Sequence, residues 1–202
     1  MRNLLLLTIL FFGCENRSNE SLPILGETIT NEYTGELIHY KVPSFSFQDQ
    51  LNQTISNEDF DEKIYVADFF FSSCPTICPK MTMNLKDVQD HFMEEERVGL
   101  ISFSIDPQND TPNVLKQYAQ KYGISDEKWS LLTGAGTDVF ELAKGYKVRA
   151  FDDSSPSEFN LIHDGTFVLI DGKRRIRGYY NGLDEGDINR LINDVTILLK
   201  SE

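Results

Sequence analysis

Cysteine and histidine are scarce in this chain of 202 residues, which contains three of each. A chain of this length buries a hydrophobic core without disulfide bridges, so few cysteines are no obstacle to folding. Basic residues are also few: 19 Lys and Arg face 32 Asp and Glu, and the net charge is −13. Because phosphate binding needs clustered Lys and Arg, this balance argues against nucleic acid as a partner.

The N-terminus has no apolar run long enough to cross a membrane. The run at residues 4–12 is far shorter than the ~20 residues of a membrane-spanning helix. It follows a basic residue and ends at Gly13-Cys14, a pattern that resembles the lipobox of bacterial lipoproteins. We expect residues 1–13 to be a signal peptide, Cys14 to carry the lipid, and residues 14–37 to tether the domain to a membrane on the exported side of a bacterial cell envelope. A plain signal peptide and a buried apolar start are the alternatives.

Apolar patterning predicts one α/β domain over residues 38–202. Alternation at 38–47, followed by a turn and residues 52–55, predicts a β-hairpin, and the continuous apolar run at 63–71 predicts a strand buried on both faces. The other expected elements are strands at 97–105, 165–171 and 175–182 and helices at about 79–96, 111–123, 137–145 and 186–200. This order predicts a thioredoxin-like fold, in which helices flank a central mixed β-sheet, with an N-terminal β-hairpin.

Two cysteines lie four positions apart in "FFFSSCPTICPKM" (69–81), each followed directly by proline. A helix starting at Pro75 would place Pro79 inside it, where its ring strikes the carbonyl four residues back. We therefore expect the helix to begin at Pro79, with Cys78 as its cap residue and Cys74 in the turn before it. The positive end of the helix stabilises thiolates, which both disulfide exchange and soft-metal binding require.

Asp68 and the three histidines are the other candidates for the site. Asp68 stands six positions before Cys74 in an apolar strand, where a carboxylate is costly unless it has a partner, a function or access to water. We expect His39 and His91 to be surface residues. His163 precedes a core strand, in a loop that would face the cysteine turn of a thioredoxin-like fold, and it is a candidate ligand.

Three segments together resemble the Sco/SenC family of copper-binding, thioredoxin-like proteins. They are "DFFFSSCPTICPKM", "SIDPQNDTP" (104–112) and the late histidine before a strand that ends in Asp. The resemblance implies that Cys74, Cys78 and His163 bind copper. It also implies delivery of copper to the dinuclear copper centre of cytochrome c oxidase, or reduction of its cysteines. The partner would be the copper-bearing oxidase subunit or another exported cuproprotein.

Two carboxylates have supporting roles under this resemblance. An Asp at the position of Asp68 lies beneath the dithiol of thioredoxins and handles its protons, so a similar role is implied here. We expect Asp106 either to orient the site or to form the turn after its strand. Two thiolates and one imidazole suit Cu(I), and Cu(II) with an added ligand, whereas zinc prefers a fourth protein ligand.

Two other functions fit the cysteine pair. One is an exported thiol-disulfide oxidoreductase, but three residues separate the cysteines instead of two, and no proline precedes "TFVLID", where thioredoxins keep a cis-proline. The other is a peroxidase of the peroxiredoxin type, for which no helper pattern accompanies the cysteine. Copper handling and thiol exchange are compatible, because only reduced thiols hold copper. The copper interpretation describes a chaperone and not a turnover enzyme.

Overall fold

The computed structural model describes residues 21–134, 138–152 and 161–201, with backbone alone at 151–152 and 161–163. The expected signal peptide and Cys14 lie outside these ranges, so their roles stay predictions. Within the described ranges, no helix is long and apolar enough to cross a membrane.

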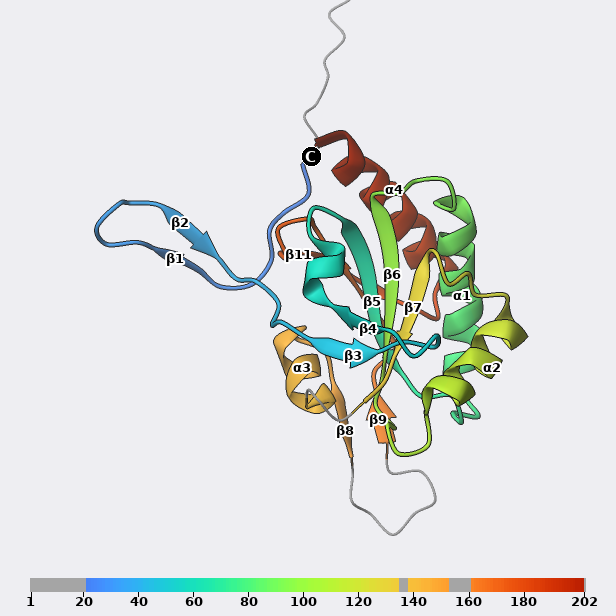
Figure 1. Cartoon of the computed structure of the whole chain (residues 1–202). Coiled ribbons are helices and arrows are strands. Elements are labelled where there is room, and N and C mark those ends of the chain that lie inside the picture. Colours follow the sequence, from blue (N-terminus) through green and yellow to red (C-terminus); the bar gives the residue numbers. More distant parts are fainter. Residues whose placement is uncertain (1–20, 135–137, 153–160, 202) are drawn as a thin grey trace, which may run out of the picture.

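A five-stranded mixed sheet forms the centre of the domain, in the order β11-β10-β5-β6-β7 (Figure 1). Strands β5, β6 and β7 are parallel, and β10 runs antiparallel to both β5 and β11. Every residue of β5 and β6 is buried, as expected for strands that are covered on both faces. The strands are β5 (Ile64–Phe70), β6 (Val98–Ser104), β7 (Trp129–Leu132), β10 (Thr166–Ile170) and β11 (Ile176–Asn181). The predicted thioredoxin-like fold is confirmed.

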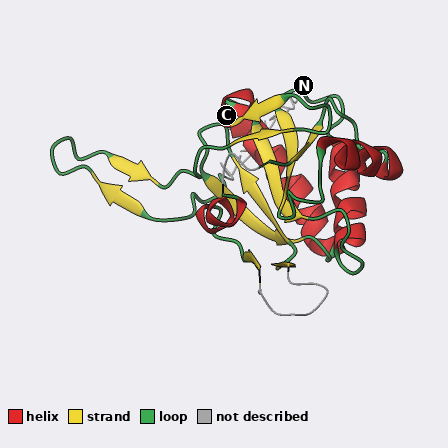
Figure 2. Ribbon diagram, turned by 60° about the horizontal axis from the view of Figure 1, so that its bottom comes forward, coloured by secondary structure: helices red, strands yellow, loops and turns green. Residues whose placement is uncertain are grey.

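Four helices cover the two faces of this sheet. They are α1 (Cys78–His91), α2 (Pro112–Tyr122), α3 (Val139–Gly145) and α4 (Glu185–Ser201). Helices α1, α2 and α4 lie on one side and α3 on the other (Figures 1 and 2). The connections β5-α1-β6 and β6-α2-β7 step across the sheet in the same direction, and right-handed crossovers then place both helices on one face. Both crossovers therefore enter their helices at the edge of the sheet where the parallel strands end.

The boundaries of α2 follow the expected capping rules, whereas both ends of α1 differ from the prediction. Helix α2 has Thr111 as its N-cap and ends at Gly123, whose φ of 68° is the left-handed conformation that glycine adopts readily. Helix α1 begins at Cys78, one residue before the predicted start, because Ile77 is already helical and its carbonyl accepts from the Met81 amide at 3.0 Å. The cap residue is therefore Ile77 and not Cys78. The helix also ends at His91, before the predicted residue 96.

The N-terminal hairpin is present, but its first strand is divided. Strand β3 (Ser46–Gln48) pairs with β4 (Thr54–Ser56), and a 3-10 turn, η1 (Asn57–Phe60), follows. Strand β2 (Leu37–His39) instead pairs with β1 (Thr28–Thr30), and these two form an arm that projects from the domain (Figure 1). Pro43 lies between β2 and β3 and has no N–H for a ladder, which favours the break.

Four strands have no counterpart in the sequence-based prediction. Strand β1 lies within residues 14–37, which were expected to be a tether, and its position comes from pairing with β2. Strand β7 has four residues, too few for a clear apolar period, and its position in the sheet comes from pairing with β6. Strands β8 (Ala150–Asp152) and β9 (Leu161–His163) form a small antiparallel pair between the expected helix at 137–145 and the expected strand at 165–171, where no element was predicted.

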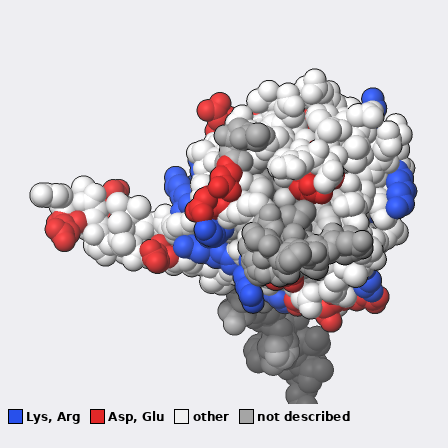
Figure 3. Space-filling view, turned by 90° about the horizontal axis from the view of Figure 1, so that it is seen from below, with Lys and Arg blue, Asp and Glu red and all other residues white. Residues whose placement is uncertain are grey.

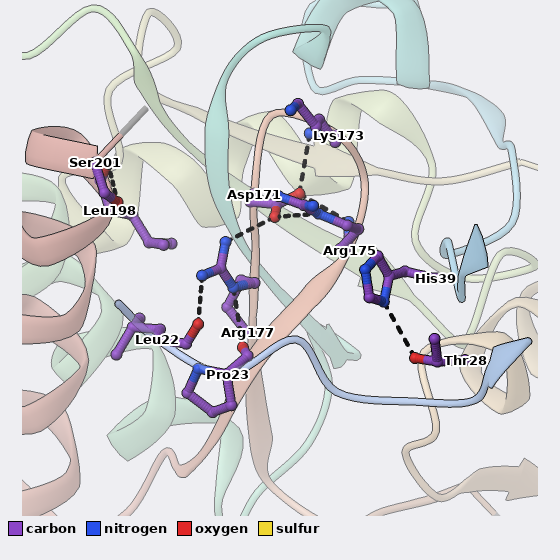
Figure 4. Close-up of polar contacts among 10 residues, drawn as sticks. All are labelled: Leu22, Pro23, Thr28, His39, Asp171, Lys173, Arg175, Arg177, Leu198 and Ser201. Atoms are coloured by element: carbon purple, nitrogen blue, oxygen red, sulfur yellow. Dashed lines mark hydrogen bonds and ion pairs between the residues drawn. The ribbon is translucent and has the colours of Figure 1, made fainter. Parts of the chain in front are cut away.

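The start of the described chain is fixed to the sheet through Arg177 (Figure 4). Its guanidinium donates to the carbonyls of Leu22 at 2.6 Å and Pro23 at 3.0 Å. It also donates to Asp171, a fully buried carboxylate, at 2.9 Å, and Arg175 donates to the same carboxylate at 2.7 Å. This end of the molecule, where both ends of the described chain lie, is opposite the β8–β9 pair (Figure 1).

Candidate metal and thiol site

Both cysteines of the motif lie in the connection between β5 and α1, at the edge of the sheet where the parallel strands end. Cys74 is in the turn that precedes α1, and Cys78 is the first residue of the helix. Their exposed fractions are 7% and 1%, and both cysteines are reduced. The neighbouring Ser73, Pro75 and Thr76 are exposed. The pair is therefore recessed beneath a surface loop that carries no charge.

The two thiols differ in their electrostatic surroundings. Burial acts to raise the pKa of Cys74, but hydrogen bonds with the Cys78 backbone and the Thr76 side chain outweigh burial and leave this pKa below its ordinary value. The Thr76 hydroxyl lies 3.5 Å from the Cys74 sulfur. Burial raises the pKa of Cys78, and the nearby Cys74 and Asp68 charges raise it further. Cys74 is thus the more readily ionised of the two thiols, and Cys78 is the one that holds its proton more tightly.

Asp68 lies in the middle of β5, beneath the thiols. It is 4% exposed and accepts a hydrogen bond from the Ser102 hydroxyl, which in turn accepts from Trp129 Nε1 at 2.8 Å. Burial raises the pKa of Asp68 to about 7, while the Ser102 hydrogen bond acts to lower it. The alternative in which this carboxylate reaches water does not fit its burial. Its effect on the pKa of Cys78 fits the role implied by thioredoxins.

The loop after β6 contains two aspartates with different surroundings. Asp106 is half-buried, and its carboxylate accepts from Asn109 Nδ2 at 2.9 and 3.0 Å, which is the turn-forming role considered from the sequence. A role for Asp106 in orienting the site stays a prediction. Asp110 is fully buried and binds Ser72, two residues before Cys74. The sequence places Asp110 after the same strand as Asp106, at the same end of the sheet and within the "DPQND" segment, but predicts no role for it.

The backbone of His163 is part of β9 and pairs with Ala150, and its side chain lies outside the described structure. Two residues later, Gly165 approaches α1 closely: a Cβ there would be 3.6 Å from Met81 Sδ and 3.7 Å from Ile77 Cδ1. The segment that carries His163 therefore passes beside the first turn of α1. Its role as a ligand remains a prediction.

The other two histidines lie elsewhere. His91 is exposed at the end of α1, and His39 in the arm lies 3.1 Å from the Thr28 hydroxyl (Figure 4). Among the described side chains, no group of three or more His, Cys, Asp or Glu has an arrangement that could hold a metal ion. That search does not include the His163 imidazole, so the described part of the candidate site is the thiol pair.

Comparison with known proteins now adds a family to this geometry. The SCO1/SenC family model matches residues 37–200. This chain belongs to the SCO1/SenC family. One similar structure is a SCO1/SenC family lipoprotein from Bacillus anthracis, with 31% identity, coverage of 79% of this chain and 95% of that chain, and a TM-score of 0.72.

Two further Sco structures are similar to this Sco-family protein. BsSco, a member of the Sco family of cytochrome c oxidase assembly proteins, has 33% identity, coverage of 81% of this chain and 95% of that chain, and a TM-score of 0.69. Yeast Sco1, solved with copper bound, has 22% identity, coverage of 80% and 90%, and a TM-score of 0.65. The likeness to yeast Sco1 shows the shared fold.

The chemistry of the Sco-family thiol pair follows from its position. Thiolates are soft donors, and burial restricts the access of water, so the pair fits the requirements of a Cu(I) ion. The same two thiols, one with a lowered and one with a raised pKa, also fit an attacking and a resolving cysteine of thiol exchange. Figure 3 views this end of the molecule, where a broad part of the described face carries neither acidic nor basic side chains.

Proposed function

We propose that this Sco-family protein binds copper through Cys74, Cys78 and His163 and carries it to the copper-bearing subunit of cytochrome c oxidase. The observation that carries the proposal is the recessed thiol pair at the start of α1. Support comes from family membership, from the copper bound to yeast Sco1 and from the role of BsSco in oxidase assembly. In this proposal copper is cargo, so the site must release the ion as well as bind it.

Each protein group has a distinct part in copper binding. Cys74, whose pKa lies below its ordinary value, ionises more readily, and Cys78, whose pKa is raised, must lose its proton when the metal binds. The neighbouring carboxylate Asp68, whose pKa is about 7, is suited to accept that proton. The imidazole of His163 completes a set of two sulfurs and one nitrogen, which suits Cu(I), and Cu(II) with an added ligand.

A second candidate function is dithiol exchange, which the unequal thiol pKa values favour. The Cys74 thiolate would attack one sulfur of a disulfide on the partner and release the other sulfur as a thiolate. Cys78 would then lose its proton, displace the partner's remaining sulfur and form the Cys74–Cys78 disulfide. The partner gains two electrons, and this protein loses two. Such a reaction would reduce the cysteines of a copper-binding subunit before copper arrives.

Titration of the reduced protein with copper tests the proposal. We expect Cys74→Ser and Cys78→Ser to abolish both Cu(I) binding, measured against a competing chelator, and the sulfur-to-Cu(II) absorption band. His163→Ala should weaken Cu(II) binding by at least about tenfold, while Cu(I) stays on the two thiolates with lower affinity. His91→Ala is the matched control, because His91 is exposed at the other end of α1.

Two results would contradict the copper site as proposed. An unchanged Cu(II) spectrum and affinity in His163→Ala would remove His163 from the site. Intact copper binding in both cysteine variants would remove the thiol pair. If the thiols exchange with disulfides and His163→Ala changes neither copper binding nor exchange, dithiol exchange becomes the better account.

A further inference from the structure

The buried carboxylate of Asp110 joins the loop after β6 to the loop that carries Cys74. Asp110 accepts a hydrogen bond from the Ser72 amide at 3.1 Å and a short one from the Ser72 hydroxyl. The Ser104 hydroxyl, at the end of β6, donates to the same carboxylate at 2.6 Å. All three donors are neutral, and Asp110 itself has no exposed surface. Burying a carboxylate among neutral donors costs folding free energy. Such a cost suggests that Asp110 has a role at this position.

The Ser72 amide is half of a planar peptide group, and the other half is the carbonyl of Phe71. Because the peptide bond is rigid, fixing the direction of its N–H also fixes the direction of its C=O. The Phe71 carbonyl accepts from the Cys74 amide at 3.2 Å. The Phe71 backbone also hydrogen-bonds the Cys78 thiol, and because this bond acts to lower the thiol pKa, the group involved is the Phe71 N–H, in the preceding peptide. The bond from Asp110 to Ser72 therefore orients the peptide carbonyl that holds the Cys74 turn, and it does so next to Phe71, the residue whose N–H contacts the Cys78 thiol.

Asp110 is itself held in place by hydrogen bonds within the loop between β6 and α2. Ser104 Oγ accepts from the Asp106 amide at 3.1 Å, and the Asp106 carbonyl accepts from the Asp110 amide at 2.8 Å. These bonds close the loop between β6 and α2 on itself. Asp110 is thus attached to the rigid end of a central strand, whereas the cysteine loop beyond Ser72 is a surface turn with exposed residues.

We infer that Asp110 is a positioning residue that holds the Phe71–Ser72 peptide, and thereby Cys74 against Cys78, in the arrangement used by the thiol pair. This inference rests on the proposed role of that pair in copper binding or exchange. The carboxylate holds two loops together by accepting on both oxygens, so a side chain with fewer acceptors loosens the cysteine turn. A loose turn lowers the effective concentration of one thiol at the other.

The direct measurement is the equilibrium constant between the Cys74–Cys78 disulfide and glutathione. It is determined on the full chain without copper, by alkylating the remaining thiols and measuring the mass of the protein. We expect Asp110→Ala to lower the equilibrium constant for disulfide formation by about tenfold, the effect of losing a hydrogen bond to a charged group. Asp110→Asn keeps one acceptor and should fall between Asp110→Ala and the parent. Cu(I) affinity should fall in the same order, because chelation also needs the two sulfurs held together.

Asp171→Asn is the matched control, and Ser72→Ala is the milder variant. Asp171 is as fully buried as Asp110 and accepts from the backbone amides of Lys173 and Arg175, but it lies at the opposite end of the sheet (Figure 4). We expect Asp171→Asn to lower the thermal stability while its disulfide equilibrium stays within about twofold of the parent, as for distant independent sites. Ser72→Ala keeps the backbone amide and gives the answer if Asp110→Ala does not fold.

The inference is overturned if Asp110→Asn and Ser72→Ala both fold and both keep the disulfide equilibrium and Cu(I) affinity of the parent. It is also overturned if Asp171→Asn shifts the disulfide equilibrium as much as Asp110→Asn does, because the effect would then come from stability alone. The proposed function fails differently: in that case the parent protein itself forms no Cys74–Cys78 disulfide and binds no copper.

Discussion

Asp68 connects the only tryptophan of the chain to the thiol pair through a single serine. Trp129 donates to Ser102, and Ser102 donates to Asp68, whose charge raises the pKa of Cys78. Each member is buried, so none is solvated by bulk water and each depends on the others for its hydrogen bonds. The fluorescence of Trp129 is therefore expected to respond to the protonation of Asp68 and to the state of the thiols.

The raised pKa of Asp68 gives a pH dependence of stability with a definite sign. The folded carboxyl has a pKa of about 7. The unfolded one has a pKa of about 3.9, so between these values the folded state binds more protons and stability falls as the pH rises. Asp68→Asn removes this contribution. We expect its unfolding free energy in urea, relative to the parent, to increase between pH 5 and pH 7 by up to about 1.4 kcal/mol per pH unit.

The Trp129 fluorescence and the urea unfolding should both be measured on reduced protein. Asp171→Asn is a suitable comparison for Asp68→Asn. The pKa of Asp171 lies below its ordinary value: burial acts to raise it, but hydrogen bonds from Arg175 and Arg177 outweigh burial. The unfolding free energy of Asp171→Asn, relative to the parent, should therefore not increase between pH 5 and pH 7. A difference between Asp68→Asn and the parent that stays constant from pH 5 to pH 7 would show that Asp68 ionises normally in the folded protein.

Among the elements, those with strong local signals could be predicted from the sequence, and those defined by pairing could not. Helix α2 was predicted at both ends because Thr111, Pro112 and Gly123 each satisfy a local rule. Strand β7 and the β8–β9 pair were missed because their positions depend on partner strands. The same limit applies to the site. The cysteines share a local motif, whereas Asp110 acts across 38 positions of sequence by bonding to Ser72.

The segment before β1 is held by Arg177 as well as by a bridge from Leu25 to Ile176 and by packing of Leu22 and Leu25 against the core. Removing this guanidinium takes away the hydrogen bonds to the carbonyls of Leu22 and Pro23. It also takes one arginine from the buried Asp171, which keeps its contact with Arg175. We expect Arg177→Ala to lower the unfolding free energy by about 3 kcal/mol, as when one partner of a buried ion pair is lost. Limited proteolysis should then cut within residues 21–30.

The control for Arg177 is Lys144→Ala, since Lys144 and Glu141 form an ion pair in which both side chains are more than half exposed. Exposed pairs contribute little, so this variant should unfold like the parent. If Arg177→Ala were as stable and as resistant to proteolysis as Lys144→Ala, residues 22–25 would not be fastened to the sheet in the way described here.

At the scale of the whole molecule, the start of the described chain and the thiol pair lie at opposite ends of the sheet (Figure 1). Cys14 precedes the first described residue, Ser21, by seven positions. Seven residues span at most about 25 Å when fully extended. If Cys14 carries a lipid, as we propose, the end with Arg177 is held near the membrane, and the thiol pair points away from it toward an exported partner.

The lipid anchor itself is tested by Cys14→Ser in cells that process lipoproteins. We expect the variant to be released from membranes or to remain unprocessed, because the residue that would be acylated is absent. Cys74→Ser should stay in the membrane fraction and serves as the control for a general effect of losing a cysteine. Membrane association of Cys14→Ser equal to that of the parent would argue against the anchor, and the described orientation would then lose its basis.

The central claim is that two sulfurs and one imidazole of this chain bind copper together. X-ray absorption of the Cu(I)-loaded protein measures those ligands directly, with His163→Ala and His91→Ala measured beside the parent. The account predicts two sulfur neighbours and one imidazole nitrogen in the parent and in His91→Ala, and two sulfurs without the imidazole signal in His163→Ala. An imidazole signal that persists in His163→Ala, or a parent spectrum with fewer than two sulfur neighbours, would contradict it.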